Sequence, residues 1–548
     1  MLLADHVSPS PNLSARETYI IMDDASPASS PGVVSTTKMH HTSRNIPFQT
    51  TTPSATTTMA MNPVSPVSSK SADRPVGEEL GISQLQLEGA EDPRNWRPRK
   101  KWIATLIVIF MTATIAFCSS IYTAAIIEIA DDYGVSREIS TLGVSTFLLG
   151  FASGPLIFAP LSEVVGRNKV YHATFLIFVF TQLACALAPN IAALLIFRFL
   201  SGFFGSPTVT NSAASLADVW PPSLRSVPFA LFSAASFLGP VIAPVVGGFL
   251  TQYTTWRWNF WLLLIISSVI YLTMIFFLPE TYAPHLLQEK RRTISTEHVR
   301  YDLLLSQWRV SLTRPWIMLF TEPIVFSLSL YMAFVYGILY LDFTAYPIVF
   351  ATTRNWSPGI AGLSFLGIGT GMVISTIASP FINKVHSRAV RKLGPVPEAR
   401  LPHLIILAWA IPVGLFWFAW TALPPTHWIV PILAGVPFGL GLVPVFLGIT
   451  AYLADCYGNH SASALAANAV LRSVFGAVFP LFARQMYKSL GTPWATSLLG
   501  FIAAALAPLP WFFYKFGPKL RDVSKYHRKT MEAEMAEVRS SHASMSSA

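Results

Sequence analysis

Four charged side chains lie within or beside the apolar runs of this chain, where they could bind or move a proton. Arg198 lies inside one run, whereas Glu128, Glu322 and Asp342 lie nearer the ends of others. A charge in lipid is costly and usually faces a protein interior or a water-filled path. A carboxylate whose pKa changes with solvent access can carry a proton. These residues are therefore proton-coupling candidates.

Each candidate also has a simpler interpretation. Arg198 is only about two turns from the expected end of its helix, so it could extend its charge to the interface instead. The three carboxylates could be interface residues or helix caps. Among them, Asp342 is the first to test, because it follows three tyrosines on one expected helix, namely Tyr331, Tyr336 and Tyr340. We predict that these rings line a substrate cavity, where they could accept flat or cationic ligands.

Residues 159–169 combine small and charged side chains in a short turn. Gly166 permits the turn, and Glu163 and Arg167 are four residues apart, so they can pair with each other or with a neighbouring helix. Asp218 closes a later apolar run on the same side of the membrane. We predict that Glu163, Gly166, Arg167 and Asp218 form a cytoplasmic latch whose charge pairs break when the protein changes conformation. The alternative is a solvated turn with a surface ion pair worth under about 1 kcal/mol.

Residues 239–248 place prolines and small residues inside another apolar run. Pro240 and Pro244 are one turn apart, so two backbone hydrogen bonds are lost and the helix is expected to bend. Gly239, Ala243 and Gly247 form a small stripe at spacing four, and Gly248 follows it. Such a stripe lets another helix approach closely. We therefore predict close helix packing here.

The elements that must position these residues follow from composition. The chain has 548 residues, of which 52% are hydrophobic and only 12% charged. Apolar runs of about 20 residues form membrane-spanning helices, because a helix satisfies its own backbone in lipid. The expected helices are at 103–126, 139–161, 170–188, 191–216, 226–250, 258–278, 323–348, 357–382, 403–421, 428–452, 464–486 and 494–514. The predicted fold is an all-α membrane protein with two pseudo-symmetric bundles of six helices.

The distribution of basic residues predicts the orientation. Lys and Arg favour the loops and tails of one side by about six to one, and the cytoplasmic side is the one enriched in them. Only Arg137, Arg257, Arg354 and Lys488 are expected in loops on the other side. We therefore expect a multi-pass cell-membrane protein with both termini in the cytoplasm. The expected parts are a disordered tail (1–95), two bundles (96–278 and 317–515), a central loop (279–316) and a second tail (516–548).

A short internal repeat supports two related halves. Leu216-Ala217-Asp218 ends the fourth expected helix and Leu453-Ala454-Asp455 ends the tenth. An Arg-Ser pair follows each triplet, at Arg225 and Arg472. Parallel repeats of this kind are a transporter architecture.

The turn at 159–169 also resembles the loop signature of the major facilitator superfamily, in particular its fungal twelve-helix drug:proton antiporters. The signature Gly-x-Leu-x-Asp-x-x-Gly-Arg-Lys matches here with Ala159 in place of Gly, Glu163 in place of Asp, and Asn168 inserted before Lys169. Residues 239–248 resemble the antiporter signature Gly-Pro-x-x-Gly-Gly, again with one Ala for Gly. The resemblance implies export, and it implies that Arg198 takes part in proton coupling. It extends from residue 92 to about 525 and includes the segment Leu-Pro-Glu-Thr-Tyr at 278–282.

Other function classes lack support in the sequence. The twelve His are scattered, and we found no nucleophile motif, metal-ligand spacing or nucleotide-binding glycine loop, so we expect no enzyme, metal or cofactor. Basic residues lie between the apolar runs rather than in one domain, which argues against a nucleic-acid partner. We expect a monomeric secondary transporter in membrane lipid that exports small organic molecules against protons. A polyamine exporter and an importer of a small organic nutrient remain alternatives.

Overall fold

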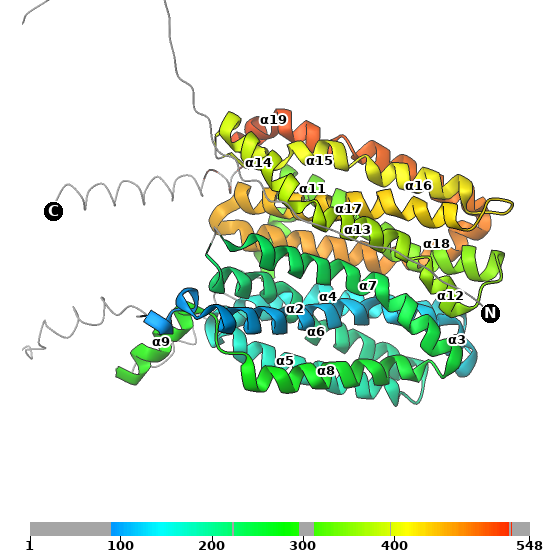
Figure 1. Cartoon of the computed structure of the whole chain (residues 1–548), viewed down its shortest axis with the longest axis horizontal. Helices are drawn as coiled ribbons and strands as arrows, with labels where there is room; N and C mark the ends of the chain where they lie inside the picture. Colours follow the sequence, from blue (N-terminus) through cyan, green and yellow to red (C-terminus); the bar gives the residue numbers. More distant parts are fainter. Residues whose placement is uncertain are drawn as a thin grey trace, which may run out of the picture. The chain divides into compact units, whose positions relative to one another are not determined.

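The computed structural model describes residues 89–221, 224–294, 312–394, 396–524, 526 and 528. Most of the predicted first tail and parts of the predicted central loop and second tail lie outside these residues. All regular secondary structure in the described part is helical, as predicted. Figure 1 shows the helices running roughly parallel to one another.

The first half contains six long helical segments. The first is formed by α2 (Pro98–Ile121), the 3-10 turn η3 (Tyr122–Ala125) and α3 (Ile126–Tyr133). The others are α4 (Arg137–Val165), α5 (Arg167–Ala186), α6 (Ile191–Val219), α7 (Ser226–Tyr253) and α8 (Arg257–Phe277). A short amphipathic helix, α9 (Ala283–Ile294), follows.

The second half repeats this series with more interruptions. It contains α11 (Pro323–Pro347) with the π-helix η5 (Ile348–Thr353), then α12 (Pro358–Leu363), α13 (Leu366–Ile377) and α14 (Ser379–Leu393). It continues with the 3-10 turn η6 (Pro397–Arg400), α15 (Pro402–Leu407), α16 (Ala410–Thr421), α17 (Ile429–Tyr457), α18 (Ser461–Leu506) and α19 (Leu509–Val523).

The last apolar segment accounts for the twelfth crossing. Eleven segments of the described chain are long and apolar enough to span a membrane, and the last, Ser461–Val523, has 63 residues. At 1.5 Å per residue it would be about 95 Å long, whereas a bilayer core is about 30 Å thick. Gly491, with φ 74° and ψ 159°, breaks this segment near its middle. Counting the two parts separately turns eleven spans into the predicted twelve.

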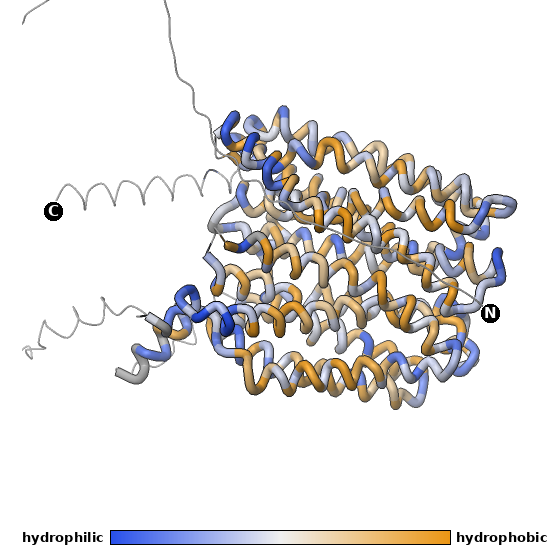
Figure 2. Tube along the Cα trace, in the orientation of Figure 1, coloured by the Kyte–Doolittle hydropathy of each residue, from blue (hydrophilic) through white to orange (hydrophobic). Residues whose placement is uncertain are grey.

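The surface matches a lipid environment. Figure 2 shows hydrophobic residues along the helices and hydrophilic ones concentrated at both ends. Large apolar side chains such as Phe180, Phe276 and Ile406 are exposed along the helices. An exposed apolar surface of this extent marks membrane contact.

The two halves use the same device to bring helices together. In the first half a Cβ on Gly202 of α6 would collide with the Phe147 carbonyl of α4. In the second half a Cβ on Gly439 of α17 would collide with the Ile368 carbonyl of α13. These are equivalent helix pairs, the second and fourth crossings of each half. Small residues at both contacts let the backbones touch, which supports the pseudo-symmetry.

The halves contact each other through α4 and α18, and through α7 with α12 and α13. We call the end of the bundle that holds the α4–α5 turn the Arg167 end, and the opposite one the Arg137 end. Gly248 of α7 lies against Pro358 of α12, and Gln252 Oε1 accepts a hydrogen bond from the Gly359 N–H at 3.1 Å. The α7–α12 contact is therefore at the Arg137 end.

Candidate functional site

Arg167 and Asp218 form a shielded ion pair at the Arg167 end. Arg167 is the first residue of α5 and Asp218 is in the last turn of α6, and Nε lies 2.6 Å from Oδ2. The guanidinium also donates to Ser162 Oγ at 3.4 Å and lies 4.9 Å from the centre of the Tyr282 ring. Burial, together with the Glu163 carboxylate, raises the pKa of Tyr282, so this ring stays neutral beside Arg167. The approach of Arg167 to Asp218 agrees with the sequence prediction.

Glu163, in contrast, forms no ion pair with Arg167 within the described residues, so that part of the prediction is wrong. The prediction assumed that Glu163 and Arg167 lie on one helix, where residues four apart are neighbours. However, α4 ends at Val165, and Gly166 turns the chain with φ 101°. The two residues are consequently on different helices, and Glu163 is exposed.

Glu280 is a member of this cluster that sequence reasoning missed. Its carboxylate accepts the N–H groups of Arg167 at 3.2 Å and Asn168 at 3.0 Å, so it caps α5. A Cβ on Gly166 would come within 2.5 Å of Glu280 Oε2. The backbone conformation at position 166 therefore favours glycine, and a larger residue would also displace the Glu280 carboxylate. The only signal in the sequence was the segment 278–282.

The second half has an equivalent pair. Arg400 Nε lies 2.8 Å from Asp455 Oδ2, and Asp455 is the aspartate of the second repeat triplet. The Arg400 and Asp455 side chains are 37% and 38% exposed, whereas those of Arg167 and Asp218 are 8% and 22% exposed. A further pair joins Arg521 of α19 to Glu398 through two contacts of 2.9 Å. Both halves thus fasten this end with charge pairs, and the Arg167–Asp218 pair is better shielded than its counterpart Arg400–Asp455.

Arg198 lies inside the first half. Its side chain is 0% exposed, and it donates to the carbonyls of Gly143 and Cys118, each at 3.0 Å. Its guanidinium also stacks on Phe147 at 4.5 Å. The alternative of a side chain reaching the interface is therefore wrong. One terminal nitrogen, Nη2, has no hydrogen-bond partner among the described residues.

The proline and glycine residues of α7 pack it closely against α2, and Gly248 packs it against α12. Pro244 has no N–H, which leaves the Pro240 carbonyl without its helical partner. The Ser120 hydroxyl of α2 donates to that carbonyl at 2.7 Å. Gly239 and Gly247 face α2, where a Cβ on Gly247 would come 2.9 Å from Ile121. The small stripe therefore makes the close contact expected of it, and the bend of α7 stays a prediction.

A small cavity of about 80 Å³ lies between the two halves. Tyr336 and Tyr340 of α11 line it, with their hydroxyls 3.3 Å apart. The Tyr340 hydroxyl donates to Ser119 of α2 at 2.8 Å, which connects the halves. Arg472 of α18, which sequence reasoning noted only as part of a repeat, also lines this space.

Tyr331 does not line the cavity and has no hydrogen-bond partner for its hydroxyl in the described part of the chain. Its inclusion with the other two tyrosines was wrong. Tyr331 and Tyr336 are five positions apart, which places their side chains about 140° apart around the helix axis. Tyr336 and Tyr340 are four positions apart, which places theirs only about 40° apart. Only Tyr336 and Tyr340 therefore share a face.

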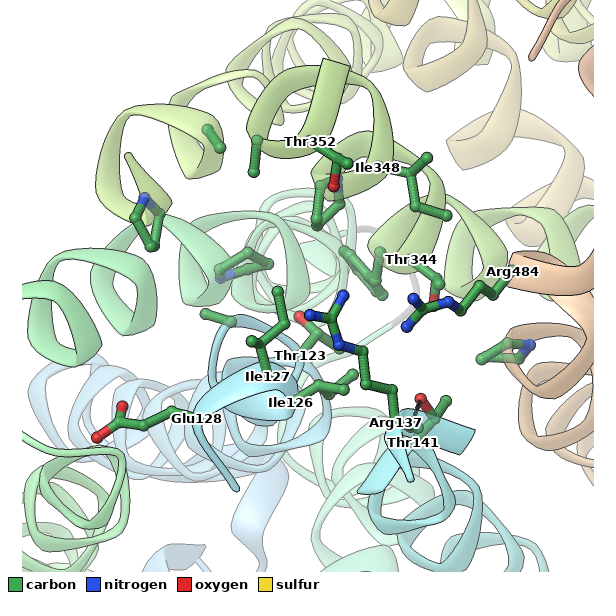
Figure 3. Close-up of a pocket in the computed structure, with 18 of the residues that line it drawn as sticks. Thr123, Ile126, Ile127, Glu128, Arg137, Thr141, Thr344, Ile348, Thr352 and Arg484 are labelled. Carbon is green, nitrogen blue, oxygen red and sulfur yellow. Dashed lines mark hydrogen bonds between the residues drawn. The ribbon is translucent and has the colours of Figure 1, made fainter. Parts of the chain in front are cut away.

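A larger cavity of about 640 Å³ lies at the Arg137 end, and we call it the vestibule. Residues of both halves line it, among them Thr123, Thr141, Pro244, Phe343, Thr344 and Tyr487. Figure 3 shows the Arg137 and Arg484 side chains reaching into the same space from α4 and α18, whereas the Glu128 carboxylate points away from them. The sequence contained no recognised signal for this cavity.

The three candidate carboxylates differ in their surroundings. Glu128 accepts the Trp256 N–H at 3.2 Å, and Glu322 accepts the Tyr457 hydroxyl at 3.1 Å near the Arg167 end. Asp342 is 4% exposed within α11 and has no ion-pair partner in the described part of the chain. Among the buried carboxylates of the described residues, Glu322 and Glu398 have hydrogen-bond partners, whereas Asp342 is isolated.

Comparison with known proteins identifies the family. The sequence profile of the Major Facilitator Superfamily matches residues 108–480. This chain belongs to the major facilitator superfamily. It is 44% identical over 440 residues to the "Efflux pump FUBT" of Fusarium oxysporum, covering 78% of this chain and 74% of that protein. It is 46% identical over 456 residues to the "Major facilitator superfamily multidrug transporter mdrA" of Aspergillus fumigatus, covering 80% and 75%.

A solved structure agrees with the fold of this superfamily member. The proton:xylose symporter XylE superposes with a TM-score of 0.57 and 15% sequence identity, covering 76% of this chain and 97% of XylE. At this identity the likeness shows the fold alone. The major facilitator fold is thus supported by sequence and by structure.

Proposed function

We propose that this chain is a secondary active transporter that exports small organic molecules, such as drugs, toxins or secondary metabolites, in exchange for protons. The observation that carries the proposal is the cavity between the two halves, which aromatic and polar side chains from both halves line. A site placed between two pseudo-symmetric halves can face either side of the membrane in turn. The relatives named as an efflux pump and a multidrug transporter support export as the direction.

We propose that the Arg167 end is cytoplasmic and that the protein acts as a monomer in the cell membrane, with both termini in the cytoplasm. The excess of Lys and Arg in the loops of that end supports this orientation. In this orientation the vestibule opens toward the exterior, where an exported molecule leaves.

The latch proposal needs one change. Arg167 and Asp218 both belong to the first half, so rocking of one half against the other does not by itself separate them. The pair instead holds the start of α5 against the end of α6, with Gly166 and Glu280 positioning the turn. We propose that this fastening keeps the end of the first half rigid while the halves move, and that its loss slows transport without changing the cavity.

We propose that Asp342 carries the proton and that Arg198 has a supporting role in coupling. An isolated interior carboxylate is stable when protonated and costly when charged, so its proton occupancy depends on access to water. Glu128 and Glu322 are weaker candidates, because each is held by a hydrogen bond near one end of the bundle.

Transport into inside-out membrane vesicles tests the function. With the vesicle lumen made acidic, we expect at least one of a panel of labelled anionic, neutral and cationic aromatic compounds to accumulate only when the protein is present. A protonophore should abolish the accumulation. Accumulation that ignores the pH gradient, or that occurs only with an alkaline lumen, would instead favour a facilitator or a proton-coupled importer.

A further inference from the structure

We propose that the cavity between the halves selects aromatic organic anions, and that Arg472 binds their acidic group. This rests on the proposed export function and specifies its substrate class. It also decides against a polyamine exporter, one of the alternatives that the sequence left open.

The state of Arg472 is the first argument. Arg472 is 8% exposed, and its guanidinium forms no ion pair within the described residues. Its Nε lies buried without a hydrogen-bond partner in the part of the chain that the structure describes. A buried charge without a counter-charge is costly, and a planar guanidinium matches a carboxylate with two parallel hydrogen bonds. A carboxylate on the substrate would provide both the missing charge and the missing acceptor.

The aromatic side chains around Arg472 are the second argument. The guanidinium lies 5.1 Å from the centre of the Tyr336 ring and 4.7 Å from that of Phe446. Phe237 of the first half meets Phe446 edge to face, with ring centres 4.8 Å apart. Both phenylalanines line the cavity. A flat ring attached to the acidic group can pack against these faces and edges when the halves part, because the cavity of about 80 Å³ in this conformation is too small for a two-ring molecule.

The charge of the lining is the third argument. Arg472 is the only ionisable group other than tyrosine among the described residues that line this cavity, and no carboxylate is among them. A polyamine carries several positive charges and requires carboxylates or a dense set of acceptors to replace its water. Placed beside Arg472, it would meet repulsion instead. The cavity therefore favours anions over cations.

The test uses three probes that share a naphthalene ring and differ in charge. They are naphthalene-2-carboxylate, the neutral naphthalene-2-carboxamide and the cation formed by 2-(aminomethyl)naphthalene. Binding to the purified full-length protein at pH 7 is measured by calorimetry. We expect the carboxylate to bind at least tenfold more tightly than the amide, and the cation to bind most weakly.

Arg472→Gln should remove the preference for the carboxylate, and Arg472→Lys should keep part of it, because the charge stays but the planar fork is lost. Lys384→Gln removes one positive charge from an exposed site on α14 and should change nothing. If Arg472→Gln does not reach the membrane, the wild-type ranking and the Arg472→Lys variant decide. A carboxylate that fails to bind, or binds no better than the amide, would overturn the proposal, as would a preference that survives in Arg472→Gln.

Binding requires no pH gradient, so its outcome is separate from that of export. An intact preference for the carboxylate without proton-driven export would contradict the proposed function alone. Proton-driven export by a protein that shows no such preference would contradict only the substrate class.

Discussion

Breaking the Arg167–Asp218 pair should cost more stability than breaking its counterpart in the second half. The contact distances are similar, 2.6 Å for Arg167–Asp218 and 2.8 Å for Arg400–Asp455. The exposure differs, because the side chains of the first pair are 8% and 22% exposed and those of the second are 37% and 38% exposed. Exposed pairs contribute about 0.2–1 kcal/mol, whereas breaking a fully buried pair costs about 3–5 kcal/mol.

The first pair is intermediate, so we expect a coupling energy of about 1–2 kcal/mol for it and below about 1 kcal/mol for the second. Double-mutant cycles with Arg167→Ala and Asp218→Asn, and with Arg400→Ala and Asp455→Asn, measure both. The assay is equilibrium unfolding in mixed detergent micelles containing SDS. Arg167→Ala should also slow transport while leaving substrate affinity nearly unchanged. Equal coupling energies, or a larger one for the exposed pair, would refute the reasoning from shielding.

Three further substitutions test separate parts of the structure. Gly247→Leu should abolish transport while the protein still reaches the membrane, because the new side chain would collide with Ile121 of α2. Transport at the wild-type rate would show that the close contact between α7 and α2 is dispensable. Ser120→Ala should lower stability by about 0.6–1.7 kcal/mol in SDS unfolding, because the Pro240 carbonyl loses its donor. Asp342→Asn should abolish accumulation driven by a pH gradient but preserve exchange of labelled for unlabelled substrate; loss of both would indicate a structural role instead.

The helices could be predicted because they depend on local signals. The Arg167–Asp218 pairing could be predicted because both residues lie at the ends of apolar runs on the same side of the membrane. Apolar runs determine where helices cross a membrane, and basic residues mark the ends of the runs. The repeat triplet drew attention to Asp218 and Asp455 in equivalent places, although the partner of Asp455 was not recognised. All twelve crossings were expected, the last two at 464–486 and 494–514. In the described chain ten crossings are separate apolar segments, and the last two share the segment Ser461–Val523, which Gly491 breaks.

The composition of the cavity was harder to predict, because it depends on helix phase and on contacts between distant segments. Tyr331 was assigned to the wrong face, since closeness in sequence was taken for a shared face. Glu163 was assigned to Arg167 without allowance for the turn at Gly166. Arg472 and Glu280 gain their importance only when residues more than 100 positions away in the sequence come close, as the Glu280–Arg167 contact does with a separation of 113 residues.

Exchange of substrate for protons is the central claim, and proton movement in proteoliposomes tests it most directly. Purified protein is reconstituted with a pH-sensitive dye in the lumen, and substrate is added outside without an imposed pH gradient. Substrate entry should release protons from the lumen, so that the lumen becomes alkaline, and Asp342→Asn should abolish this change. Substrate entry with an unchanged luminal pH would contradict the account, because the protein would then be a facilitator without proton coupling.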